Sequence, residues 1–141
     1  MPSTTISSRR LDVALAILRL AVGAVFIAHG GQKLFVYGFD GVAGAFAQMG
    51  VPMAGIVGPL VALLEFFGGI ALVVGRLTRV AALGLAATMV GALALVHAPA
   101  GFFLPNGSEF ALSLLAVTLS LALVGAGRFA IDAKIAERRA H

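Results

Sequence analysis

The sequence contains no cysteine, and this absence removes a whole class of chemistry. Without a thiol the chain can form no disulfide, hold no metal ion or iron–sulfur cluster through thiolates, and carry no dithiol relay. Any redox role would therefore need a bound cofactor, and we predict no metal site of the thiolate kind.

Charged residues are also scarce. They make up 11% of the 141 residues, against 60% hydrophobic residues, and the mean hydropathy is +1.06. Water-soluble domains carry roughly 25% charged residues, so this chain cannot cover its surface with polar groups and is predicted to lie in lipid. The net charge is +4, but no basic run alternates with aromatic residues, which argues against a nucleic-acid partner.

Four apolar runs have about the length at which a helix crosses a bilayer, which takes about 20 residues. Glycine, proline, asparagine or charged residues separate the runs, and none shows the alternating pattern of a membrane β-strand. We predict an all-α membrane protein, a four-transmembrane-helix bundle forming a single transmembrane domain over residues 1–141. The predicted spans are 11–35, 52–75, 80–97 and 110–125.

Two further segments lie outside the predicted spans. In 38–50, between the first two spans, Phe39, Val42 and Phe46 recur at helical spacing, which predicts a short interfacial helix. Residues 132–141 form a charged tail. Arginine and lysine gather before the first span, between the second and third, and after the fourth, so the positive-inside rule places both termini in the cytoplasm.

Arg19 and Glu65 lie deep inside the predicted spans, where a charge costs about 2.5–3.5 kcal/mol by insertion scales. Arg19 lies about 12 Å from the predicted cytoplasmic end of the first span, and Glu65 lies about 15 Å from that end of the second. The two side chains should therefore share a layer, and we predict a buried ion pair between them. Such a pair would either fix the helix register or take part in a proton or ligand site.

The opposite, outer mouth of the bundle is predicted to collect polar side chains from the ends of different spans. Two histidines and a carboxylate at one depth indicate a functional pocket, although hydrogen-bonded packing residues are the alternative. Haem b held between the two histidines is a further alternative. The predicted ligand-binding residues are His29, Gln32, Lys33, His97 and Glu109.

Several short motifs occur in order along the chain: His29-Gly30-Gly31-Gln32-Lys33-Leu34-Phe35, Glu65 before Gly68-Gly69, Gly75 with Thr78-Arg79, His97, Phe102-Phe103 before Asn106-Gly107 and Glu109-Phe110, and Gly127-Arg128 with Asp132. In that order and spacing the sequence resembles the DoxX family, from about Leu11 to Asp132. The resemblance implies a small multi-pass protein of the bacterial inner membrane, related to subunits of quinone-linked oxidoreductases. The fold is also similar to the bundle of vitamin K epoxide reductase, whose cysteine chemistry this chain cannot perform.

Two main functions compete on these grounds. The first is an accessory subunit that binds a quinone while an oxidoreductase partner supplies electrons; His29, Lys33 and His97 would donate hydrogen bonds, and Glu65 or Glu109 would exchange protons. The second is a scaffold or binding protein in the membrane, whose buried charges only hold the helices and which has lipid, a partner subunit or a second copy as neighbours. Proton or small-solute transport is disfavoured, because the polar path is discontinuous.

Overall fold

The structure, a computed structural model, describes residues 8–139, and no strand occurs within that range. The predicted all-α fold is confirmed. The elements are α1 (Ser8–Gly31), the π-helical turn η1 (Gln32–Tyr37), α2 (Gly38–Gln48), α3 (Ala54–Val74), α4 (Thr78–Ala92), η2 (Leu93–His97), η3 (Ala98–Ala100), α5 (Glu109–Val124) and α6 (Ile131–Arg139).

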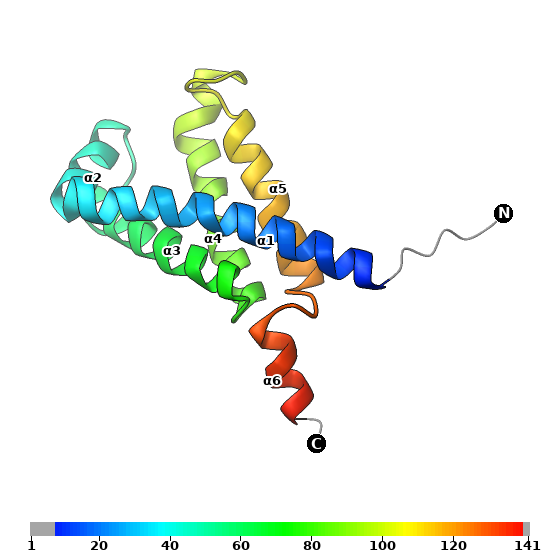
Figure 1. Ribbon diagram of the computed structural model, residues 1–141. Helices are drawn as coiled ribbons and strands as arrows, with labels where there is room; N and C mark the ends of the chain where they lie inside the picture. Colours follow the sequence, from blue (N-terminus) through cyan, green and yellow to red (C-terminus); the bar gives the residue numbers. More distant parts are fainter. Residues whose placement is uncertain (1–7, 140–141) are drawn as a thin grey trace.

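The helices associate as two pairs (Figure 1). α1 lies alongside α3, α4 lies alongside α5, and the second pair crosses the first. At one end of the molecule α1 begins, α3 turns into α4, and α5 stops; we call this the proximal end. The opposite end contains α2 and the connection 98–108, and we call it the distal end. α6 projects away from the proximal end.

The short helix α2 follows α1 with a change of direction at Gly38. This residue has φ of 67°, in the left-handed region that glycine adopts without strain. The chain then folds α2 against the first half of α3, where the buried Val42 meets Gly58. A short helix therefore occupies the predicted place between the first two long helices.

Large apolar side chains lie both inside the bundle and on its outside. The centre contains Phe26, Leu72, Leu85 and Leu121, while many others point outward, up to Leu123 with 79% of its surface exposed. Such a surface requires lipid in place of water. The continuous helical segments Ser8–Gln48, Ala54–Val74 and Thr78–Ala100 are long and apolar enough to cross a membrane, and α5 is a shorter apolar helix.

α1 and α3 approach each other at glycine positions. A Cβ atom on Gly30 would overlap the backbone nitrogen of Phe66, and one on Gly69 would lie 2.8 Å from the carbonyl oxygen of Gly23. Small residues at membrane helix interfaces permit this approach. The contact at Gly30 brings the distal part of α1 against the middle of α3, which positions the side chains described below.

Gly30→Ala is expected to destabilise the protein by about 1–3 kcal/mol, the usual cost of an added carbon in a tightly packed interior. The added carbon would meet the backbone of Phe66, which cannot move away as a flexible side chain can. Gly31→Ala is the matched control, since its Cβ would meet ring atoms of Phe66 at 3.6 Å and of Phe35 at 3.9 Å, which is ordinary van der Waals contact. Unfolding of both variants in detergent micelles tests this, and equal stability would contradict the proposed close contact.

The proximal end is fastened by Asp132 at the start of α6. Its two carboxylate oxygens accept hydrogen bonds from the N–H groups of Leu77 and Thr78, at 2.8 and 2.9 Å, and its own N–H donates to the Gly75 carbonyl at 2.9 Å. Asp132 therefore caps the first turn of α4 from a distant part of the chain. The N-cap residue of α4, Leu77, has no side chain that could do so.

The Asp132 cap is expected to be lost in acid. Burial acts to raise the pKa of Asp132, but the N–H groups of Thr78 and Leu77 and the charge of Arg76 outweigh it and hold the pKa below its ordinary value. The cap therefore contributes stability above the ordinary titration range of aspartate and loses it as the pH falls through the lowered pKa.

Amide hydrogen exchange at Leu77 and Thr78 should consequently be faster at about pH 3 than near neutral pH, after correction for intrinsic rates. Asp132→Asn should cost about 1 kcal/mol near neutral pH and remove most of this pH dependence. Protection that is independent of pH in the unsubstituted protein would contradict the assigned role of the carboxylate.

Candidate functional site

The predicted ion pair between Arg19 and Glu65 does not form, and each side chain has other partners. Arg19 is 3% exposed and donates to the carbonyl oxygens of Leu72, Val73 and Phe129. The depth estimate placed Gly75, at the end of α3, level with the start of α1. In the structure Gly75 lies beside Arg19 instead. Glu65 precedes Phe66, whose backbone packs against Gly30, so Glu65 lies far closer to the distal end.

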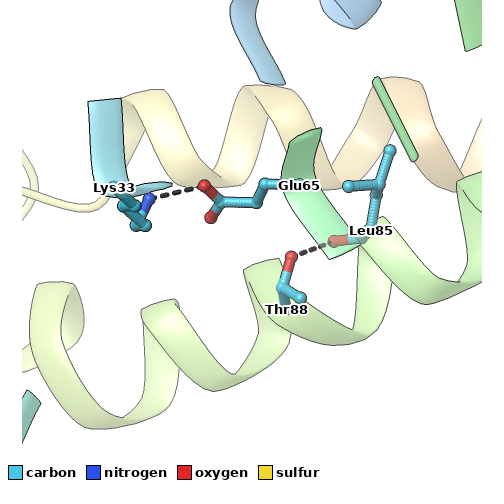
Figure 2. A network of polar contacts seen from close by, with 4 residues as sticks. All are labelled: Lys33, Glu65, Leu85 and Thr88. Carbon is cyan, nitrogen blue, oxygen red and sulfur yellow. Dashed lines mark hydrogen bonds and ion pairs between the residues drawn. The ribbon is translucent and has the colours of Figure 1, made fainter. Parts of the chain in front are cut away.

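The partner of Glu65 is Lys33, which extends from the π-helical turn after α1. Lys33 Nζ donates to Glu65 Oε2, as Figure 2 shows, and this is the one salt bridge found among residues 8–139. The Glu65 side chain is 6% exposed and that of Lys33 is 19% exposed. A charge pair this far from solvent holds its geometry because separating it would leave a buried charge without a partner.

The pair lies in the wall of a cavity of about 690 Å³ between the two helix pairs. α1 and α3 form one wall, α4 and α5 the other, while α2 and the distal connection close over the end through Phe46, Met49, Leu104 and Gly107. Most lining atoms are apolar. Sites for small molecules have volumes of about 300–1,000 Å³ and combine apolar walls with a few polar groups.

Both predicted histidines line this cavity, from opposite walls. His29 on α1 lies against Phe110 of α5, with the ring centroids 6.1 Å apart. His97 is 3.0 Å, through Nδ1, from the carbonyl oxygen of Asn106. Because a carbonyl oxygen only accepts, Nδ1 carries the proton, and Nε2 of the neutral ring remains an acceptor.

Gln32 and Glu109 do not line the cavity. Gln32 is exposed on the turn after α1, one position away from Lys33. Glu109 Oε1 accepts from the Leu104 N–H at 2.8 Å and so holds the distal connection in place. The structure thus brings together His29, Lys33 and His97 from the predicted cluster, and adds Glu65 to them.

Thr88 is a polar residue of the site that the sequence analysis missed. It lines the cavity from α4, and its hydroxyl donates to the Leu85 carbonyl at 2.8 Å (Figure 2). Its oxygen can therefore accept but has no further proton to give. The signal in the sequence was available, since Thr88 stands between Gly84 and Gly91 in an otherwise apolar run, and both glycines also line the cavity.

The arrangement is suited to binding a small amphiphilic molecule. It offers a cationic donor at Lys33, carboxylate and hydroxyl acceptors at Glu65 and Thr88, and two imidazoles, all within apolar surroundings. No group of three or more histidine, aspartate or glutamate side chains within 8–139 is placed to hold a metal ion.

Comparison with known proteins gives a consistent picture. A family model named DoxX matches residues 14–98. "Uncharacterized membrane protein Rv3486" of Mycobacterium tuberculosis is 33% identical over 86% of this chain and 80% of that protein. "Putative oxidoreductase CatD" of Bacillus subtilis is 29% identical over 89% of each, and "Inner membrane protein YqjF" of Escherichia coli is 34% identical over 86% and 91%. No solved structure matches the chain.

Proposed function

This chain is a membrane protein of the DoxX family, and from that premise we propose that it is an accessory subunit of a membrane oxidoreductase system that binds a quinone in the cavity between its helix pairs. The observation that carries the proposal is the Lys33–Glu65 pair, buried in the wall of an apolar cavity of about 690 Å³. The name of the Bacillus subtilis relative, which includes the word oxidoreductase, supports the same reading.

The residues present fit a quinone. Its ring and prenyl tail are apolar and suit walls made by Val25, Phe26, Leu64 and Leu114. Its carbonyl oxygens need donors, which Lys33 supplies through Nζ and His29 through a ring N–H. When bound, it would supply the redox chemistry that a chain without cysteine cannot carry in its own side chains.

The protein's cellular membrane and its orientation in that membrane are also part of what we propose. We place the protein in the bacterial inner membrane, as the name of the Escherichia coli relative suggests. The basic residues of the proximal end, among them Arg76, Arg79 and Arg128, then lie on the cytoplasmic side together with both termini. The cavity, at the distal end, is reached from the outer half of the bilayer, where a lipid-soluble ligand can enter between the helix pairs.

Quinone binding by the protein in lipid nanodiscs tests the proposal. We expect endogenous quinone to remain bound after gentle extraction, as seen by native mass spectrometry, and added decylubiquinone to bind. The double variant Lys33→Met/Glu65→Met should bind at least about tenfold more weakly, since a hydrogen bond to a charged group contributes about 1.5–3 kcal/mol. Gln32→Met, a neighbour outside the cavity, should bind normally.

Two results would contradict the proposal. Absence of any quinone, endogenous or added, from correctly folded protein would favour the alternative of a scaffold whose buried charges only hold the helices. Equal binding by the double variant would show that quinone associates with the lipid or with another surface.

A further inference from the structure

The two oxygens of the Glu65 carboxylate are not equivalent. Oε2 accepts from Lys33, whereas Oε1 has no hydrogen-bond partner among the residues that the structure describes. Figure 2 shows Lys33 meeting only one of the two oxygens. Because Glu65 lines the cavity and is otherwise 6% exposed, this remaining oxygen is an acceptor available to a bound molecule.

Lys33 presents the complementary chemistry at the same place. An ammonium group has three protons, and within 8–139 Glu65 Oε2 is the one side-chain or backbone acceptor recorded for Nζ. Lys33 also lines the cavity. A donor and an acceptor are therefore held side by side in one wall, fixed against each other by their ion pair.

The polar side chains of the wall facing this pair, Thr88 and His97, add two acceptors. The Thr88 hydroxyl proton is already given to the Leu85 carbonyl, so Thr88 Oγ1 can only accept. His97 is also held with its Nδ1 proton on the Asn106 carbonyl, which leaves Nε2 of the neutral ring as an acceptor. A ligand that only accepts hydrogen bonds would leave these groups unused.

A quinone and its quinol differ in this respect. The oxidised headgroup has carbonyl oxygens, which accept, and the reduced headgroup has hydroxyl groups, which donate. We infer that the Lys33–Glu65 pair accommodates both redox forms at one position, with Lys33 Nζ donating to the oxidised headgroup and Glu65 Oε1 accepting from the reduced one. This inference rests on the proposed function and identifies Glu65 as the residue that selects for the reduced form.

Glu65→Gln tests the inference in a specific way. The amide oxygen must face Lys33, because Lys33 only donates, so the amide NH₂ takes the place of Oε1 and turns that acceptor into a donor. We expect affinity for decylubiquinol to fall about 10- to 100-fold while affinity for decylubiquinone changes by less than about threefold. The measurement is calorimetric titration in nanodiscs without oxygen, with the quinol kept reduced by dithionite.

Glu109→Gln is the matched control, because it makes the same chemical change in a carboxylate outside the cavity, and it should bind both forms normally. A second test leaves the protein unchanged and so does not depend on the variant folding. The dimethyl ether of decylubiquinol has the same ring without hydroxyl donors and should compete at least about tenfold more weakly than the quinol.

The possible results distinguish quinone binding itself from the role of Glu65 in selecting the reduced form. If the unsubstituted protein binds neither redox form, the proposed function fails. If it binds quinone but Glu65→Gln weakens both forms equally, or if the dimethyl ether competes as well as the quinol, the redox-form inference is overturned while quinone binding stands.

Discussion

Lys33→Met alone is expected to lower the free energy of unfolding by about 3 to 5 kcal/mol, because it leaves the Glu65 carboxylate buried without a partner. Glu65 is 6% exposed, and Lys33 is the one residue of 8–139 that forms a salt bridge with it. Methionine fills a similar volume, so loss of packing adds little to this cost. Unfolding in detergent micelles by titration with a denaturing detergent provides the measurement.

The double variant Lys33→Met/Glu65→Met is expected to recover most of this stability. Replacing both members of a buried ion pair by apolar residues is often neutral, whereas removing one member leaves an uncompensated charge. Gln32→Met controls for the added apolar surface at the neighbouring, exposed position. If Lys33→Met were as stable as the unsubstituted protein, the carboxylate would have to be reached by water, and the enclosed site described above would be wrong.

This double variant also separates stability from function. Restored stability together with lost quinone binding would show that the charges are kept for the ligand and not for the fold. Restored stability with binding intact would instead place the quinone in the lipid or on another surface, as stated for the binding test. The single and double variants therefore need to be compared in the same membrane preparation.

Much of the fold could be predicted from hydropathy alone. The apolar runs predicted four long helices and a short one between the first two, and α1, α3, α4, α5 and α2 lie on those runs. The reason is physical, since a backbone in lipid must satisfy its own hydrogen bonds and helices do so locally. The membrane boundaries, the single-domain division and the cytoplasmic position of both termini remain predictions.

The pairing of charges could not be predicted in the same way, because it depends on how far one helix is shifted along its neighbour. The predicted Arg19–Glu65 pair assumed that the first and second spans end at one level. α1 in fact begins well beyond the end of α3, and the space beside its first turns is filled by the chain after α5, where the Arg128 N–H donates to Asp12. Nothing in an apolar run specifies that shift.

Three of the five predicted ligand-binding residues, His29, Lys33 and His97, line the cavity, and side-chain direction explains which ones do. His29 and Lys33 are one helical turn apart and share a face, so both reach the cavity, while Gln32 lies on another face. Glu109 was placed by depth alone, and depth does not reveal that its carboxylate turns back to the Leu104 N–H. The direction of each side chain, more than its level in the membrane, decided which predictions agreed with the structure.

Arg19→Met is expected to destabilise the protein by about 4 kcal/mol or more, since hydrogen bonds from a charged group contribute about 1.5–3 kcal/mol each and three carbonyls lose theirs. These carbonyls belong to Leu72, Val73 and Phe129, at 2.9, 3.0 and 3.1 Å from the guanidinium nitrogens. The first two are at the end of α3 and the third precedes α6, so Arg19 joins three parts of the chain at the proximal end. The measurement is again unfolding in micelles, with limited trypsin digestion to detect release of α6 at Lys134.

Arg19→Lys should restore little of this stability, because an ammonium on a flexible stem cannot match the planar, forked donors that reach carbonyls on two segments. Leu20→Met, at an exposed neighbouring position, serves as the matched control and should behave as the unsubstituted protein. Arg19 does not line the cavity, so protein of Arg19→Met that remains folded should bind decylubiquinone with unchanged affinity. If Arg19→Met were folded and stable yet failed to bind decylubiquinone, Arg19 would belong to the ligand site. The assignment of Arg19 to a purely structural role at the proximal end would then be wrong.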